Sequence, residues 1–222
     1  LERLKFVSIF TSNLDEFFMI RVGSLHDMTL MGENSVDNKS GLTARQQLEA
    51  IFDAVRPLIR RKDEICASLQ RELEEYGICE LDLNRLEKPE HKYLKHYFDQ
   101  EMDPILSPQI VDSHHPFPHL VNKVLHVGAL LRDKRGEMFG FIPVPASLPE
   151  VVFLPGAQVR YIHTADILLS QVEKIFRGYE VVEKTVFCVT RNADITPNDE
   201  AFEVDEDFRA QMRKLLRSRT KL

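Results

Sequence analysis

Apolar residues recur at helical spacing from the start of the chain. After Ser12, the positions that keep the three- and four-residue repeat of one helix face are Leu14, Phe17, Phe18, Val22 and Leu25. Ser12 is a common N-cap residue and Asp15 follows three places later. The pattern therefore predicts that a second helix begins at Asn13, where unpaired backbone N–H groups would point outward.

A longer helical run follows the polar, turn-rich residues 32–41. Thr43 and Gln46 form a capping-box sequence at its start, and Gly77 marks its end. The apolar positions on one face are Leu48, Ile51, Phe52, Val55, Leu58, Ile59, Ile65, Leu69, Leu73 and Tyr76. A continuous helix here would be about 50 Å long, and Pro57 would kink it because proline removes a backbone hydrogen bond. We expect one arm of an antiparallel helical bundle.

A third helix and a change of pattern come next. Pro89 suits the first turn of a helix that runs to about Glu101, with Tyr93, Tyr97 and Phe98 available for a core. Pro104 then ends the helical pattern. The later β-rich runs are Val121–Leu131, Met138–Val144, Val151–Leu154, Val159–Ile162 and Val181–Val189. A helix capped by Thr164 and closing at Gly178 separates the last two runs.

These elements predict two domains with a boundary near Ile105–Ser113. The first domain, residues 1–106, is expected to be an antiparallel helical bundle with a long helix. The second, residues 107–222, is expected to be a smaller α+β domain that is incomplete. The fold class is therefore α followed by α+β.

Composition narrows the class of protein. The 222 residues are 43% hydrophobic and 29% charged, which suits an ordinary globular protein. No apolar run approaches the roughly 20 residues that cross a bilayer. The three scattered cysteines, Cys66, Cys79 and Cys188, suggest free, packed thiols in a reducing cytoplasm. The net charge of −6 argues against a general nucleic-acid binder.

The predicted helix start at Ser12 and Asn13 has two interpretations. The orphan N–H groups and the positive end of the helix dipole would bind an anion. Alternatively, Ser12 and Asn13 only cap a buried helix. Asp15 and Glu16 would repel a bare phosphate, so a bound nucleotide would need Mg²⁺ or nearby arginines.

The opening residues Leu1–Val22, LERLKFVSIFTSNLDEFFMIRV, resemble the N-terminal domain of bacterial polyphosphate kinase. Weaker similarity continues in the family's order through the HHPFPHL, FIPVP, FLPG and VTRNADI segments. The resemblance implies an enzyme that reversibly transfers the terminal phosphate of ATP to polyphosphate through a phosphohistidine. It also implies that the chain is a front fragment, with its first helix cut and its second domain incomplete.

The resemblance assigns candidate site residues. Asn13 matches the family's nucleotide-contacting asparagine, and Phe6 and Leu14 match the apolar surface near the adenine. The catalytic histidine, the phosphate-binding arginines and the Mg²⁺ ligands are expected in later domains, so this chain alone should be inactive and contain no metal site. Expected partners are ATP or ADP, polyphosphate and further copies of the chain in a homo-oligomer.

Other polar groups are weaker candidates. His114, His115, His119 and His126 suggest a metal site, but Pro116 and Pro118 interrupt the helical spacing that would align the ligands. The segment TRNADITPND, Thr190–Asp199, could bind phosphate or Mg²⁺, form a turn, or make a dimer contact. The basic residues Arg213, Lys214, Arg217, Arg219 and Lys221 could follow a phosphate chain or form a solvated helix end.

Without the resemblance, the residues favour a different class of protein. The long helix and the mixed domain would then form a non-catalytic interaction module, used for dimerisation or as an adaptor. No P-loop, dinucleotide-binding or hydrolase-elbow sequence is present. A nucleotide site would therefore depend on Asn13.

Overall fold

The computed structural model describes residues 1–30, 36–111, 117, 118 and 120–192. The chain divides into two compact units, Leu1–Leu69 with Thr190–Leu222, and Gln70–Val189. We call the first the helical unit and the second the α+β unit. The sequence placed the domain boundary at residues 106/107, whereas the compact units divide earlier, because the helix after residue 87 packs into the core of the α+β unit.

The helical unit begins with one uninterrupted helical rod. Helix α1, Glu2–Phe17, continues through a π-helical turn, Phe18–Val22, into α2, Gly23–Leu30. The prediction of a helix start at Ser12 and Asn13 is therefore wrong. Residues 2–22 contain no Gly or Pro, and the apolar repeat continues across Ser12, so nothing stops propagation of the helix.

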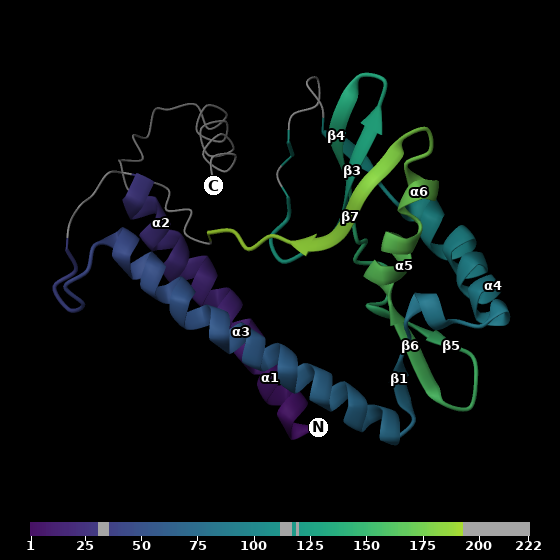
Figure 1. Ribbon diagram of the computed structural model, residues 1–222, viewed down its shortest axis with the longest axis horizontal. Helices are drawn as coiled ribbons and strands as arrows, with labels where there is room; N and C mark the ends of the chain where they lie inside the picture. The colour runs from purple at the N-terminus through teal and green to yellow at the C-terminus, as the bar shows by residue number, and fades with distance from the viewer. Residues whose placement is uncertain (31–35, 112–116, 119, 193–222) are drawn as a thin grey trace, which may run out of the picture. The chain divides into compact units, whose positions relative to one another are not determined.

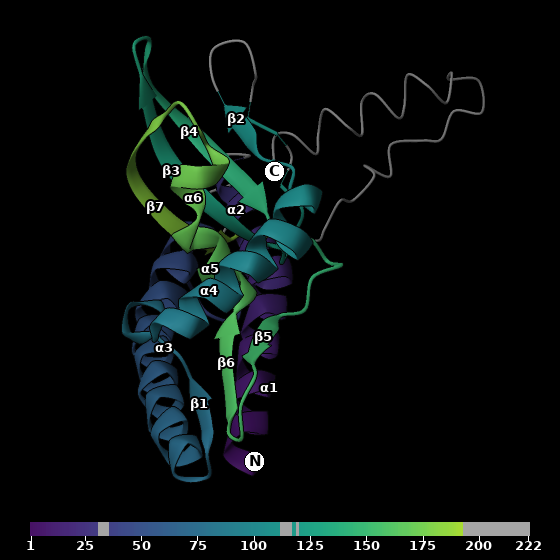
Figure 2. The same cartoon turned by 90° about the vertical axis from the view of Figure 1, so that its right-hand side faces the viewer.

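The long helix is confirmed as α3, Ala44–Glu75. Its capping box forms: the Thr43 backbone N–H donates to Gln46 Oε1 at 3.0 Å, and the Gln46 N–H donates to Thr43 Oγ1 at 3.4 Å. Gly77 follows the helix with a φ of 73°, the left-handed conformation that glycine adopts readily. Pro57 lies inside the helix. Within the helical unit, α1 and α3 run antiparallel (Figure 1 and Figure 2).

The predicted apolar face of α3 is only partly covered. Val55 and Leu69 are buried, but Leu58 is 50% exposed and Tyr76, just past the helix, is 83% exposed. Two contacts join the rod to the first part of α3. Phe18 and Phe52 have ring centroids 6.2 Å apart, and Arg21 donates to Gln47 at 3.0 Å.

The α+β unit contains two sheets. A three-stranded sheet has the order β1 (Ile78–Glu80), β6 (Val159–His163), β5 (Val151–Leu154), with β1 and β6 parallel. A four-stranded antiparallel sheet has the order β2 (Gln109–Val111), β4 (Gly136–Pro143), β3 (Leu125–Asp133), β7 (Glu180–Cys188). The five predicted strands are confirmed with small boundary shifts, and β1 and β2 were not predicted.

Helices pack against these sheets. Helix α4, Lys88–Tyr97, starts with Pro89 in its first turn and a Glu87/Glu90 capping box, then continues as a π-helical turn, Phe98–Met102. Short 3₁₀ turns occupy Leu83–Arg85 and Asp103–Ile105. Helices α5, Thr164–Ser170, and α6, Val172–Ile175, precede β7. The predicted N-cap role of Thr164 is wrong, because His163 occupies the N-cap position. The Thr164 hydroxyl instead donates a hydrogen bond to the Pro149 carbonyl oxygen.

The core of the α+β unit joins α4, both sheets and α5–α6. Its best-buried members include Phe98, Met102, Leu131, Ile142, Leu168 and Val172. At Gly140 on β4, an added Cβ would lie 2.5 Å from a methyl group of Leu131 and 3.0 Å from the ring of Phe176. The sheet and the helices therefore pack as closely here as the backbone allows.

Candidate functional site

Asn13 and Phe6 lie on one exposed face of α1. They are seven residues apart, so their side chains project within about 20° of each other around the helix. Asn13 is exposed and Phe6 is 68% exposed. No hydrogen bond links the Asn13 side chain to another residue in the described part of the chain. The structure thus places these two predicted residues on the same helix face, about two turns apart, and leaves both accessible to a ligand.

Leu14 occupies a different side of α1. It is half-buried, and it lies about 100° from Asn13 around the helix. Of the three predicted site residues, only Asn13 and Phe6 therefore share the exposed face.

The expectation of unpaired backbone N–H groups at Asn13 is wrong for the same reason as the predicted helix start. Asn13 lies within α1, where backbone N–H groups are used by the helix itself. Asp15 and Glu16 lie within one turn of Asn13 and would repel phosphate oxygens. This face suits a neutral, hydrogen-bonding and apolar group better than a phosphate group.

A groove between α1 and α3 extends from Phe6. Its volume is about 640 Å³, and its lining residues are Arg3, Phe6, Val7, Phe10, Leu58, Arg61, Lys62, Glu64, Ile65 and Ser68. The floor is apolar. At the rim, Arg61 pairs with Glu64 at 3.3 Å and Lys62 with Asp63 at 2.9 Å. Ion pairs of this kind are weak, so their cations can also contact a ligand. The groove therefore suits a flat apolar group with cations at its edge.

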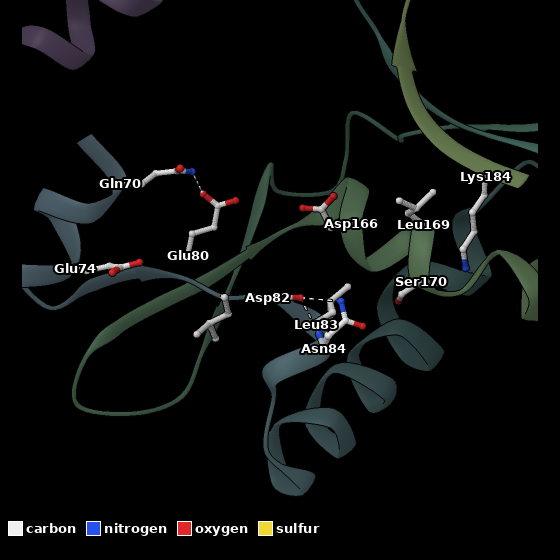
Figure 3. Close-up of a pocket in the computed structure, with 11 residues that line it drawn as sticks. Gln70, Glu74, Glu80, Asp82, Leu83, Asn84, Asp166, Leu169, Ser170 and Lys184 are labelled. Carbon is white, nitrogen blue, oxygen red and sulfur yellow. Dashed lines mark hydrogen bonds between the residues drawn. The ribbon is translucent and has the colours of Figure 1, made fainter. Parts of the chain in front are cut away.

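A second pocket lies in the α+β unit (Figure 3). Its volume is about 700 Å³, and the carboxylates in its lining belong to Glu74, Glu80, Asp82 and Asp166. Glu80 accepts a hydrogen bond from Gln70 at 2.6 Å, and its side chain and that of Asp166 point toward one another across the opening. Burial raises the pKa of Asp166, His163 opposes that shift, and Glu80 adds to it.

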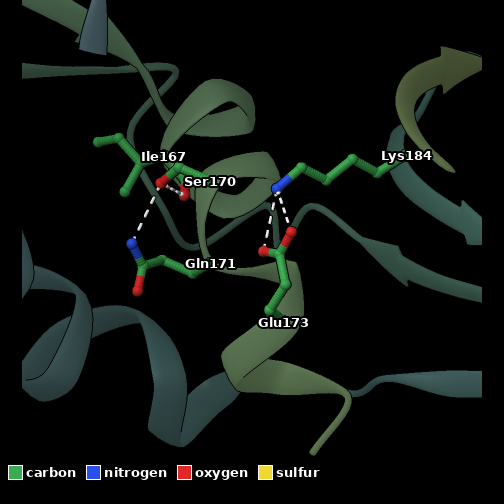
Figure 4. A network of polar contacts seen from close by, with 5 residues as sticks. All are labelled: Ile167, Ser170, Gln171, Glu173 and Lys184. Atoms are coloured by element: carbon green, nitrogen blue, oxygen red, sulfur yellow. Dashed lines mark hydrogen bonds and ion pairs between the residues drawn. The ribbon is translucent and has the colours of Figure 1, made fainter. Parts of the chain in front are cut away.

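Lys184 contributes the cation in this pocket's lining, and it is already paired (Figure 4). Its Nζ donates to both carboxylate oxygens of Glu173, at 2.8 and 2.9 Å. Burial would raise the pKa of Glu173, but the hydrogen bonds from Lys184 and the backbone lower it below its ordinary value. The pocket is therefore acidic and repels a phosphate chain.

The histidine hypothesis finds no support in the described residues. His126 is 2% exposed on β3, its Nδ1 lies 2.8 Å from the Val124 carbonyl, and its ring stacks on Phe187. His114, His115 and His119 lie outside the described residues. No cluster of three or more potential metal ligands occurs in the part of the chain that the structure describes.

The cysteine predictions are mostly confirmed. Cys66, Cys79 and Cys188 form no disulfide bond with one another. Cys66 and Cys79 are half-buried, but Cys188 is exposed on β7, so its expected packing role is wrong. None of the described helices combines the length and apolarity that crossing a membrane requires.

The segment after β7 contacts the helical rod. Asn192 donates a hydrogen bond to Asp27 on α2. Sequence reasoning missed this pairing because 165 positions separate the two residues. Residues 193–199 of this segment, and the basic residues Arg213–Lys221, lie outside the described residues.

Comparison with known proteins identifies the family. Residues 1–81 match the polyphosphate kinase N-terminal domain, and residues 89–222 match the polyphosphate kinase middle domain. The chain is 38% identical to polyphosphate kinase of Bacillus anthracis over 213 residues and 40% identical to that of Bacillus cereus over 209 residues. Each alignment covers 90% of this chain and 30% of the relative.

A solved structure agrees with these matches. The crystal structure of polyphosphate kinase from Porphyromonas gingivalis superposes with a TM-score of 0.67 at 26% identity, covering 86% of this chain and 29% of that one. The two matched domains define an N-terminal helical module joined to an α+β module. The chain belongs to the polyphosphate kinase family, and it spans about 30% of the length of the curated relatives it matches.

Proposed function

We propose that this chain forms one wall of the nucleotide site in a polyphosphate kinase. The complete enzyme would transfer the terminal phosphate of ATP reversibly to polyphosphate through a phosphohistidine. The observation that carries the proposal is the shared exposed face of Phe6 and Asn13 on α1. Membership of a kinase family supports ATP as the ligand for that face.

Asn13 and Phe6 would hold the base of the nucleotide. An asparagine amide both donates and accepts hydrogen bonds, which matches the mixed edge of adenine. Phe6 offers an exposed aromatic ring for stacking beside the apolar groove. The acidic neighbours Asp15 and Glu16 favour a pose in which the phosphates point away from α1.

The chain's part in the reaction is positioning. Phosphoryl transfer depends mainly on alignment and charge stabilisation, so a fixed base directs the terminal phosphate toward the catalytic groups. The described residues offer no cluster for Mg²⁺. Mg²⁺ would travel with the nucleotide phosphates, held by groups outside the described residues. Because the 222-residue chain spans about 30% of the length of its relatives, we expect it to catalyse no transfer by itself.

Assembly and location are further parts of this proposal. We expect the complete kinase to be a homo-oligomer in the cytoplasm. The absence of a disulfide among Cys66, Cys79 and Cys188 suits a reducing compartment.

Paired substitutions on α1 test the nucleotide wall. In the complete kinase, Phe6→Ala should raise the KM for ATP several-fold, because it removes the stacking surface. Leu4→Ala is the matched control, since Leu4 is also exposed, at 45%, but projects from the opposite side of α1. An equal change in KM for both variants, or no change for Phe6→Ala, would contradict the proposal.

A further inference from the structure

The π-helical turn Phe18–Val22 leads directly into Gly23 and α2. Because helical residues four apart share a face, Gly23 and Asp27 lie on one side of α2. With His26 and Leu30, they border a hollow of about 250 Å³. Leu48 and Phe52 of α3 form its other helical wall. Short π-helical turns are frequent at functional positions, and this one ends immediately before Gly23.

The segment Thr190–Asn192, which we call the strap, lines the same hollow. It belongs to the helical unit although it follows the last strand of the α+β unit. Asn192 Nδ2 donates to Asp27 Oδ2 at 2.5 Å. A hydrogen bond to a carboxylate is about twice as strong as a neutral one.

Gly23 allows the Asn192 side chain to approach the helix. A Cβ at Gly23 would lie 2.6 Å from the Cγ and 2.7 Å from the Oδ1 of Asn192. These distances are shorter than any normal contact, so a side chain at position 23 and the observed Asn192 position are incompatible. The missing side chain and the carboxylate one turn later therefore suit the same amide.

We propose that Gly23 and Asp27 form a docking site for Asn192, and that this latch holds the strap against the helical rod. The latch joins two residues 165 positions apart, so its release frees the strap from α2. The latch is independent of the nucleotide wall. It gives TRNADI a structural role at Asn192, in place of a phosphate site.

Reciprocal exchange of the two side chains tests the latch. Asn192→Asp places two carboxylates together and should open the latch. The double variant Asp27→Asn/Asn192→Asp restores one amide and one carboxylate and should close it again. Hydrogen–deuterium exchange in α2 reports the open population directly. We expect Asn192→Asp to raise exchange there by about tenfold, and the double variant to reverse most of that rise.

Two further variants complete the test. Asn38→Asp adds the same charge at an exposed position of the helical unit and should leave exchange in α2 unchanged. Gly23→Ala should raise exchange in α2 and in the strap, because its methyl group displaces Asn192. Circular dichroism confirms that each variant is folded. Unchanged exchange in Asn192→Asp, or no recovery in the double variant, would overturn the proposal.

Discussion

The helical unit and the α+β unit differ in how completely they bury their apolar residues. The α+β unit encloses a continuous core that joins α4, both sheets and α5–α6. In the helical unit, α1 has no buried residue at all, and Phe6, Ile9 and Ile20 are 68%, 51% and 47% exposed. Large exposed apolar surfaces usually mark places of interaction. The α+β unit therefore has a core of its own, whereas the α1 surface is available for binding.

The same substitution in the two units should give the largest contrast. Phe98 is fully buried and lies under the ammonium group of Lys174, so Phe98→Ala should lower the free energy of unfolding by about 3–5 kcal/mol. Phe6→Ala should change it by less than about 0.5 kcal/mol. Urea denaturation of both variants measures the difference. Similar losses for the two variants would remove the contrast between the units.

A smaller contrast is expected within α3. Val55 is 8% exposed and Leu58 is 50% exposed. Val55→Ala should lower the free energy of unfolding by about 1.6 kcal/mol, from about 0.8 kcal/mol for each buried CH₂. Leu58→Ala removes more atoms but should lower it less. If Leu58→Ala were the more damaging, the groove that Leu58 lines would be covered in solution.

The smallest effect concerns Asp166 in the acidic pocket. Burial raises its pKa above the ordinary value of 3.8, so folding disfavours the ionised form. Its stabilising contribution is present below that ordinary value and is lost as the pH rises through the raised folded-state pKa. Asp166→Asn should therefore raise the melting temperature at pH 7 slightly. The gap in melting temperature between the variant and the unsubstituted protein should narrow toward pH 4. A constant gap across this range would show that Asp166 does not titrate as described.

Local patterns predicted local structure well. Thr43 and Gln46 identified the start of α3 because a capping box needs only four residues, and the five longer strands carried enough β-branched residues to be found. The predicted helix start at Ser12 was wrong because a residue that can cap a helix can also lie within one. Strand β1 was missed because its three residues form a strand by pairing with β6, about 80 positions away in the chain.

The candidate site also has some features that the sequence predicts and others that it does not. The periodicity of α1 is sufficient to place Phe6 and Asn13 on one face, although the family resemblance was needed to single them out. The Asn192–Asp27 contact and the acidic pocket depend on folding brought about by distant segments. No local sequence pattern predicts the Asn192–Asp27 contact or the acidic pocket.

ATP kinetics of Asn13→Ala in the complete kinase would show whether the exposed face of α1 binds the nucleotide. Ser12→Ala is the control, since Ser12 is the adjacent exposed polar residue and projects about 100° away. We predict that Asn13→Ala weakens ATP use several-fold with an unchanged melting temperature, while Ser12→Ala keeps normal kinetics. Unchanged ATP kinetics in Asn13→Ala would contradict the account.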